Sequence, residues 1–153
     1  MIYLVRHAKA GSRQEWRGDD RQRPLSKEGR RQADSLARKL ARLTEGQLIT
    51  SPYLRCEQTL EPLASVARLP ILPDERLAEA TGFEGALALL SEVPDGSVLC
   101  SHGDVIPDTM AALERRGCTI VGDPDWRKAS VWVLRRDDDG QVVEAMSWPP
   151  PEP

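Results

Sequence analysis

The strongest constraint on the fold of this chain is the apolar segment at residues 2–5, which ends abruptly at Arg6 and His7. A short, continuously apolar segment bounded by polar residues predicts a strand buried in an α/β sheet. Open α/β sheets bind their ligands in the crevice outside the carboxyl ends of the strands. A guanidinium and an imidazole there fit an anion site with a nucleophile beside it. A solvated strand cap, with His7 bonded to a loop carbonyl, fits these two residues equally well.

A second segment ends in the same way. Residues 97–101 form a short apolar run after a Pro-Asp-Gly turn signal and stop at His102. The chain contains only 2 histidines, and both follow a predicted buried strand. If the two strands are neighbours in one parallel sheet, the imidazoles face each other across one crevice. Residues 47–51 predict another strand, and the helix-start signal at Ser51-Pro52 places Arg55 in a first helical turn near the same edge.

Strands and helices alternate along the rest of the chain, apart from a hairpin near its end. This alternation predicts a three-layer α/β/α sandwich with a mostly parallel central sheet and antiparallel edge strands. We expect one domain at residues 1–148 and a Pro-rich tail at 149–153. The remaining predicted helices lie at about 26–43, 53–67, 83–90 and 105–116, and the remaining strands at 71–72, 129–135 and 141–148.

Length, charge and cysteine spacing limit the function classes. A chain of 153 residues suits one core, and a formal net charge of −3 argues against nucleic-acid binding driven by net charge. The 3 cysteines have neither paired nor zinc-type spacing, and we find no signal sequence or apolar membrane span. We therefore expect a cytoplasmic protein without a metal site, a membrane partner or a nucleic-acid partner. The sequence does not predict its oligomeric state.

Basic residues gather in the segment that follows the first strand. Arg13, Arg17 and Arg21 are candidates for the rim of an anion site, where they would attract a negatively charged substrate. The alternative is that they are solvated residues of an ordinary loop.

Three motifs, taken in order, resemble those of the histidine phosphatase superfamily, which is also called phosphoglycerate-mutase-like. The resemblance extends to about Trp132 and is greatest to the small branch of bacterial phosphohistidine phosphatases. Residues 6–12, 18–21 and 23–25 are also similar to the phosphatase domain attached to some actinobacterial Nudix hydrolases. One departure is Ala8, where the family usually has glycine. The motifs are Arg6-His7-Ala8, Ser51-Pro52-Tyr53-Leu54-Arg55 and Ser101-His102-Gly103-Asp104.

This resemblance implies a metal-independent phosphatase that needs no cofactor and forms a phosphohistidine intermediate on His7. Arg6 and Arg55 would bind the phosphoryl oxygens, and His102 would stabilise the charge that develops on them. Glu79 would be the general acid. A solvated glutamate fits that position equally well, and the competing carboxylates are Glu75, Glu84 and Asp104.

The implied substrate is a phosphomonoester or phosphoramidate, carried by a small molecule, a nucleotide or a phosphohistidine protein. The alternative is a catalytically silent module of the same fold that binds phosphate or a nucleotide. The two classes differ in whether the chain turns over p-nitrophenyl phosphate without added metal, and whether His7→Ala removes that activity.

Overall fold

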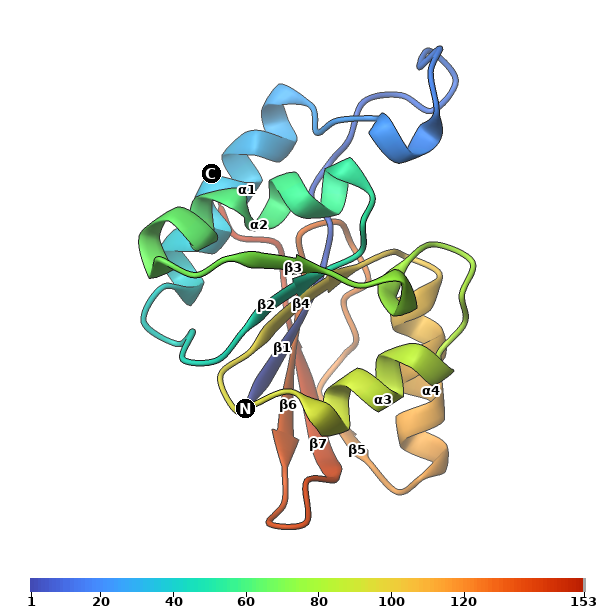
Figure 1. Cartoon of the computed structure of the whole chain (residues 1–153). Helices are drawn as coiled ribbons and strands as arrows, with labels where there is room; N and C mark the ends of the chain where they lie inside the picture. The colour runs from blue at the N-terminus through green and yellow to red at the C-terminus, as the bar shows by residue number, and fades with distance from the viewer. Residues whose placement is uncertain (153) are drawn as a thin grey trace.

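The computed structural model of the chain describes residues 1–152 (Figure 1). Within them, the strands are β1 Ile2–Arg6, β2 Leu48–Thr50, β3 Ile71–Pro73, β4 Val98–Ser101, β5 Thr119–Val121, β6 Val131–Arg136 and β7 Val142–Trp148. They form one sheet with the order β3-β2-β4-β1-β6-β7-β5. Strands β3, β2, β4 and β1 are parallel, β6 runs antiparallel to β1, and β7 returns antiparallel to β6. The predicted mixed sheet with a C-terminal hairpin is confirmed.

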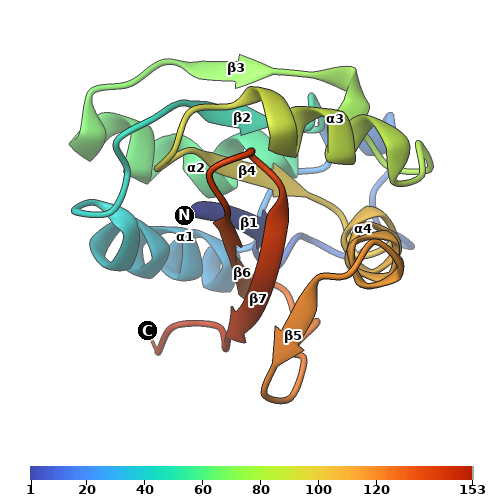
Figure 2. The ribbon, with the colours of Figure 1, turned by 90° about the horizontal axis from the view of Figure 1, so that it is seen from below.

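Four α-helices and two short 3-10 helices lie among the described residues. They are α1 Lys27–Leu40, α2 Leu54–Ala67, α3 Glu84–Glu92, α4 Val105–Arg115, η1 Asp20–Gln22 and η2 Glu75–Leu77. Figure 2 shows α1 and α2 on one face of the sheet and α3 and α4 on the other. The protein is therefore the predicted three-layer sandwich. None of the helices in residues 1–152 is both long and apolar enough to span a bilayer.

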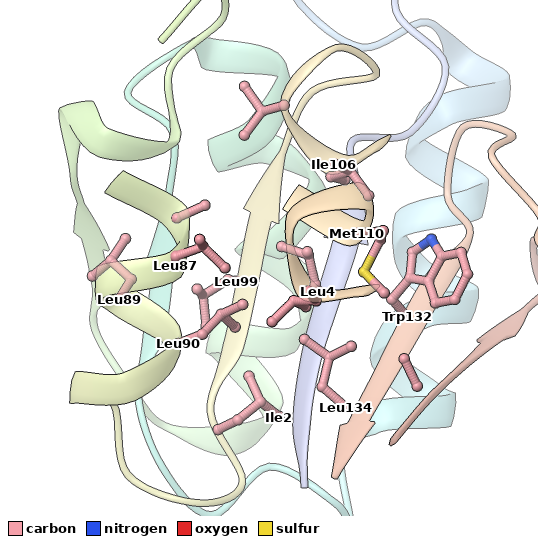
Figure 3. Close-up of a cluster of buried hydrophobic side chains, with 14 of the residues drawn as sticks. Ile2, Leu4, Leu87, Leu89, Leu90, Leu99, Ile106, Met110, Trp132 and Leu134 are labelled. Atoms are coloured by element: carbon pink, nitrogen blue, oxygen red, sulfur yellow. The ribbon is translucent and has the colours of Figure 1, made fainter. Parts of the chain in front are cut away.

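The period-two alternation of β1 divides the core between the two faces. Leu4 packs with the α3 and α4 side, together with Leu90 and Met110, as Figure 3 shows. The next residue, Val5, belongs to the cluster on the α1 and α2 side, with Leu36. Because both faces of β1 are buried, the strand reads as continuously apolar and its first polar residues lie at its carboxyl end.

Helix α1 begins where its sequence predicts. The Ser26 hydroxyl accepts a hydrogen bond from the Gly29 amide at 3.1 Å, as an N-cap does. The predicted extension of this helix to residue 43 is wrong, because the helix ends at Leu40 and the following turn leaves Leu43 38% exposed.

The hairpin follows the prediction, with one strand added. β5 was not predicted, and it pairs parallel with β7 at the edge of the sheet. After Trp148 the chain has no regular structure up to residue 152, and Pro150 lies beside Lys9 and Lys128. Residue 153 of the predicted tail lies outside the described residues.

Candidate active site

The carboxyl ends of the parallel strands β1, β4 and β2 lie at one edge of the sheet, below the loop drawn in blue at the top of Figure 1. The parallel register sets Arg6 on β1 beside Ser101 on β4, and the residue after each strand is a histidine. The His7 and His102 rings lie edge to face with centroids 5.5 Å apart. The sequence expectation that both imidazoles open on one crevice agrees with this geometry.

His7 is held in one tautomer by the backbone. Its Nδ1 lies 2.8 Å from the carbonyl oxygen of Ala8, and because a carbonyl can only accept, Nδ1 carries the proton. Nε2 is then left with its lone pair. Burial is the main cause that lowers the pKa of His7 to about 3, and the charges of His102, Arg55 and Arg6 lower it further. The ring is neutral at physiological pH, as a nucleophile must be.

His102 is buried and contacts side chains from the connection between β2 and α2 and from α2 itself. Its Nε2 shares a 2.8 Å hydrogen bond with the Ser51 hydroxyl and lies 3.6 Å from the Cys56 sulfur. The Tyr53 ring packs edge-on against it at 4.7 Å. These contacts fix the orientation of the ring, as the partners of a functional imidazole usually do.

Arg6 keeps most of its hydrogen-bonding capacity. One of its terminal nitrogens, Nη1, donates to the carbonyl of Trp126. Its Nε is buried and has no partner in residues 1–152. The Gly103 backbone lies so close that an added Cβ would meet the guanidinium at 2.6 Å. A glycine at 103 therefore makes room for the Arg6 head group at the crevice.

Arg55 is almost completely buried, with a side chain 1% exposed, and is paired with two carboxylates. Its Nη2 donates to Glu79 at 2.9 Å and to Asp20 at 3.1 Å, and Nη1 donates to the Asp20 carbonyl at 2.9 Å. A buried charge needs such partners, because removing an ion from water without them costs a free energy on the order of several kcal/mol.

These side chains line a cavity of about 680 Å³. Its charged lining is mostly cationic, and the two carboxylates in it are Glu79 and Asp104. The pKa of Lys128 is lowered, first by burial and then by the neighbouring arginine and lysine charges. The cavity therefore has an excess of positive charge that suits an anionic ligand. The basic residues of the lining are Arg6, Lys9, Arg13, Arg23, Arg55 and Lys128.

The three loop arginines proposed from the sequence are placed differently. Arg13 lines the cavity and donates to Glu79 at 3.0 Å. Arg17 is exposed and lies outside the cavity lining. Arg21 also lies outside it, because both its terminal nitrogens pair with Glu75, at 3.1 and 2.9 Å, while its guanidinium stacks on Tyr53.

Glu79 lies in the cavity wall, whereas two of its competitors do not. Glu75 pairs with Arg21, and Glu84 lines a separate hollow beside α3. Asp104 lines the cavity and accepts the Ala80 amide at 2.8 Å. Ala80 has φ 66°, a left-handed conformation that costs a non-glycine residue free energy, so the Asp104 contact stabilises the turn that carries Glu79.

Sequence reasoning did not assign Lys9, Arg23, Lys128 or Asp20 to the site, although the first three line the cavity and Asp20 pairs with Arg55. Arg23 is 6% exposed and lines the cavity, and Asp20 contacts three guanidiniums around it. Arg23 and Asp20 both lie in the basic segment, and their residue types alone do not predict which side chains they contact in the fold.

Ala8 keeps an ordinary backbone. Its φ is not positive, so a β-carbon is compatible with the local conformation. Its amide donates to Thr59 at 2.9 Å, and its carbonyl accepts from His7, so the residue links α2 to the candidate nucleophile. Among residues 1–152, no group of three His, Cys, Asp or Glu side chains is arranged to hold a metal ion.

Comparison with known proteins gives a consistent family. Residues 2–86 match the sequence profile of the histidine phosphatase superfamily (branch 1). The chain is also similar to a protein of Mycolicibacterium smegmatis (strain ATCC 700084 / mc(2)155) named 8-oxo-(d)GTP phosphatase, with 36% identity over 99% of this chain. That alignment covers 48% of the relative, so the chain spans about half its length.

Solved structures share the fold. The protein histidine phosphatase SixA, solved in complex with tungstate, superposes with a TM-score of 0.73 at 22% identity and covers 96% of this chain and 93% of that chain. A protein described as the putative phosphohistidine phosphatase SixA from Agrobacterium tumefaciens superposes with a TM-score of 0.68 at 25% identity, covering 87% of this chain and 89% of that one.

Proposed function

The chain belongs to the histidine phosphatase superfamily, and we propose that it is a phosphatase that needs no metal ion and forms a phosphohistidine on His7. The observation that carries this proposal is the contact between His7 Nδ1 and the Ala8 carbonyl at the wall of the cavity. The Nδ1–H of His7 is donated to the Ala8 carbonyl at 2.8 Å, and burial keeps the ring neutral, so the Nε2 lone pair is available in a cationic cavity.

The reaction has two halves. In the first, Nε2 of His7 attacks phosphorus, a P–N bond forms, and the bond from phosphorus to the leaving group breaks with its electron pair going to that group. Glu79 gives the leaving group a proton. In the second, water attacks phosphorus, the P–N electron pair returns to Nε2, and the Glu79 carboxylate takes a proton from the water. Phosphate then leaves.

The charge on the phosphoryl oxygens is neutralised by side chains of the cavity. Arg6 has unpaired N–H groups, and Arg55 provides a second guanidinium. His102, fixed by Ser51, would donate a hydrogen bond to the same oxygens. Positioning and charge neutralisation are most of what phosphoryl transfer asks of an enzyme.

For the substrate we favour a nucleotide with more than one phosphate over a phosphohistidine protein. Lys9, Arg13, Arg23 and Lys128 line the cavity beyond the residues assigned to the transferred group, so further anionic groups have partners there. The similarity to an 8-oxo-(d)GTP phosphatase supports the same choice.

The test uses the purified chain in buffer with a chelator. We expect turnover of p-nitrophenyl phosphate and of nucleoside di- and triphosphates, and trapping of a base-stable, acid-labile phosphohistidine when the reaction is quenched in alkali. His7→Ala should abolish both signals. Unchanged turnover by His7→Ala would overturn the proposal. Binding of orthophosphate by wild type without turnover of any substrate would instead support a silent phosphate-binding module.

A further inference from the structure

Asp20 attaches the loop after β1 to three guanidiniums of the site. Its Oδ1 accepts from Nε of Arg23 at 2.9 Å, and its Oδ2 accepts from Nη2 of Arg55 at 3.1 Å. The Asp20 carbonyl accepts from Nη1 of Arg55 at 2.9 Å, and Nε of Arg13 lies 3.8 Å from Oδ1. Asp20 therefore contacts two arginines of its own loop and one arginine of α2, which only folding brings together.

The position of Asp20 relative to the cavity differs from that of Glu79. Both carboxylates contact Nη2 of Arg55, but only Glu79 belongs to the cavity lining, together with Arg23 and Arg55 themselves. Asp20 thus contacts the guanidiniums from outside the cavity, where it does not compete with a bound anion for space.

We propose that Asp20 is a positioning residue that sets the guanidiniums of Arg55 and Arg23 for the phosphate of the substrate; this inference rests on the proposed phosphatase function. The side chains of these arginines are 1% and 7% exposed. Without the carboxylate, two buried like charges lose a shared counterion, and each long side chain regains rotamers that point elsewhere. Asp20 therefore acts on the substrate through the arginines.

The geometry predicts that asparagine cannot replace this aspartate. Each carboxylate oxygen serves a different guanidinium, whereas an amide has one oxygen and one NH₂ group. In Asp20→Asn the NH₂ group must face either Arg23 or Arg55, donor against donor. Asp19→Asn is the matched control, because it removes the same charge one residue away. Asp19 caps η1 through the Arg21 amide, and asparagine caps equally well.

The experiment combines steady-state kinetics with a calorimetric measurement of orthophosphate binding. We expect Asp20→Asn to raise KM for p-nitrophenyl phosphate and Kd for orthophosphate by about tenfold, the size of one charge-assisted hydrogen bond. Asp19→Asn should leave both within about twofold. Asp20→Glu, which keeps two oxygens, should recover part of the loss, and thermal unfolding of each variant reports whether it is folded.

A double-mutant cycle separates positioning from general damage. If Asp20 acts through Arg55, Asp20→Asn should lower kcat/KM of an Arg55→Ala enzyme by less than about threefold. Full additivity of the two losses, or unchanged KM and Kd in folded Asp20→Asn, would overturn the inference. Should wild type bind orthophosphate but turn over nothing, the proposed function fails while the binding measurements still decide the role of Asp20.

Discussion

His7 and His102 directly follow the adjacent parallel strands β1 and β4, with their rings edge to face and 5.5 Å between centroids. The two rings have different partners. His7 donates to a backbone carbonyl, whereas His102 contacts the Ser51 hydroxyl. In the proposed reaction, this difference would let His7 stay neutral and attack phosphorus while His102 interacts with the phosphoryl oxygens.

The buried neutral His7 should make folding stability depend on pH. Its folded pKa of about 3 lies below the ordinary value of 6.5, so the unfolded chain binds more protons between these pH values. Stability should therefore fall as pH decreases below about 6.5, by about 1.4 kcal/mol per pH unit, or about 2 kcal/mol between pH 7 and pH 5. Urea unfolding at both pH values measures this loss.

The control is His7→Gln, which removes the titrating ring and should flatten the dependence over the same range. Carboxylates titrate mostly below pH 5 and affect both proteins alike. A loss of the same size in wild type and variant would show that His7 is not the group responsible.

Ser51→Ala should release the His102 ring. The substitution removes the 2.8 Å hydrogen bond to Nε2 of His102. We expect kcat to fall about tenfold with little change in KM, because losing the group that orients a functional histidine typically lowers activity by about that factor. Ser97→Ala is the matched control, since Ser97 is also fully buried and hydrogen-bonded but lies at the other end of β4. It should lower stability and leave kcat unchanged.

Glu79→Gln should discriminate between leaving groups. A proton donor matters for an alkoxide leaving group but hardly for p-nitrophenolate, so kcat should fall about 10²-fold or more for an alkyl phosphate and much less for p-nitrophenyl phosphate. Glu75→Gln, which affects a glutamate outside the cavity, should change neither rate. Equal losses on both substrates would remove Glu79 from the role of general acid.

Gly103→Ala should weaken substrate binding without unfolding the protein. The new methyl would lie 2.6 Å from the Arg6 guanidinium, the mobile end of a side chain, which can shift aside. We expect KM to rise about tenfold while the melting temperature changes little. Gly29→Ala provides the contrast. Its methyl would meet the Lys9 carbonyl of the backbone, which cannot shift cheaply, so stability should fall instead.

Arg13 and Arg17 provide a matched pair for the substrate class. Both are exposed arginines of one loop, but only Arg13 lines the cavity. If a nucleoside triphosphate is the substrate, Arg13→Gln should raise its KM about threefold to tenfold relative to p-nitrophenyl phosphate. Arg17→Gln should leave this ratio unchanged. An equal effect of both substitutions would point to general electrostatic attraction.

The sequence predicted elements whose signals are local. The predicted start of a helix at about residue 26 agrees with α1, which Ser26 caps, and the abrupt ends of two apolar segments predicted His7 and His102 at one edge. β5 was missed because three residues with exposed ends carry no periodic signal, and only pairing with β7 makes them a strand.

The charged groups of the site were harder to place, because their partners are distant in sequence. Arg13, Arg17 and Arg21 look alike in the sequence, yet the fold gives Arg21 a bidentate partner in Glu75 and leaves Arg17 outside the cavity. The contact between Asp20 and Arg55 likewise follows from how the loop folds over α2. Such choices depend on tertiary structure and not on residue type.

The two carboxylates on Arg55 have a consequence for the end of the proposed catalytic cycle. An anion that binds this guanidinium would displace the Glu79 carboxylate, which lies 2.9 Å from it. When inorganic phosphate departs in this reaction, the same carboxylate would return to Arg55, so release would not leave the guanidinium without its Glu79 partner. We therefore expect weak product inhibition by inorganic phosphate. Phosphate concentrations that would saturate an arginine pocket without a neighbouring carboxylate should not inhibit this chain.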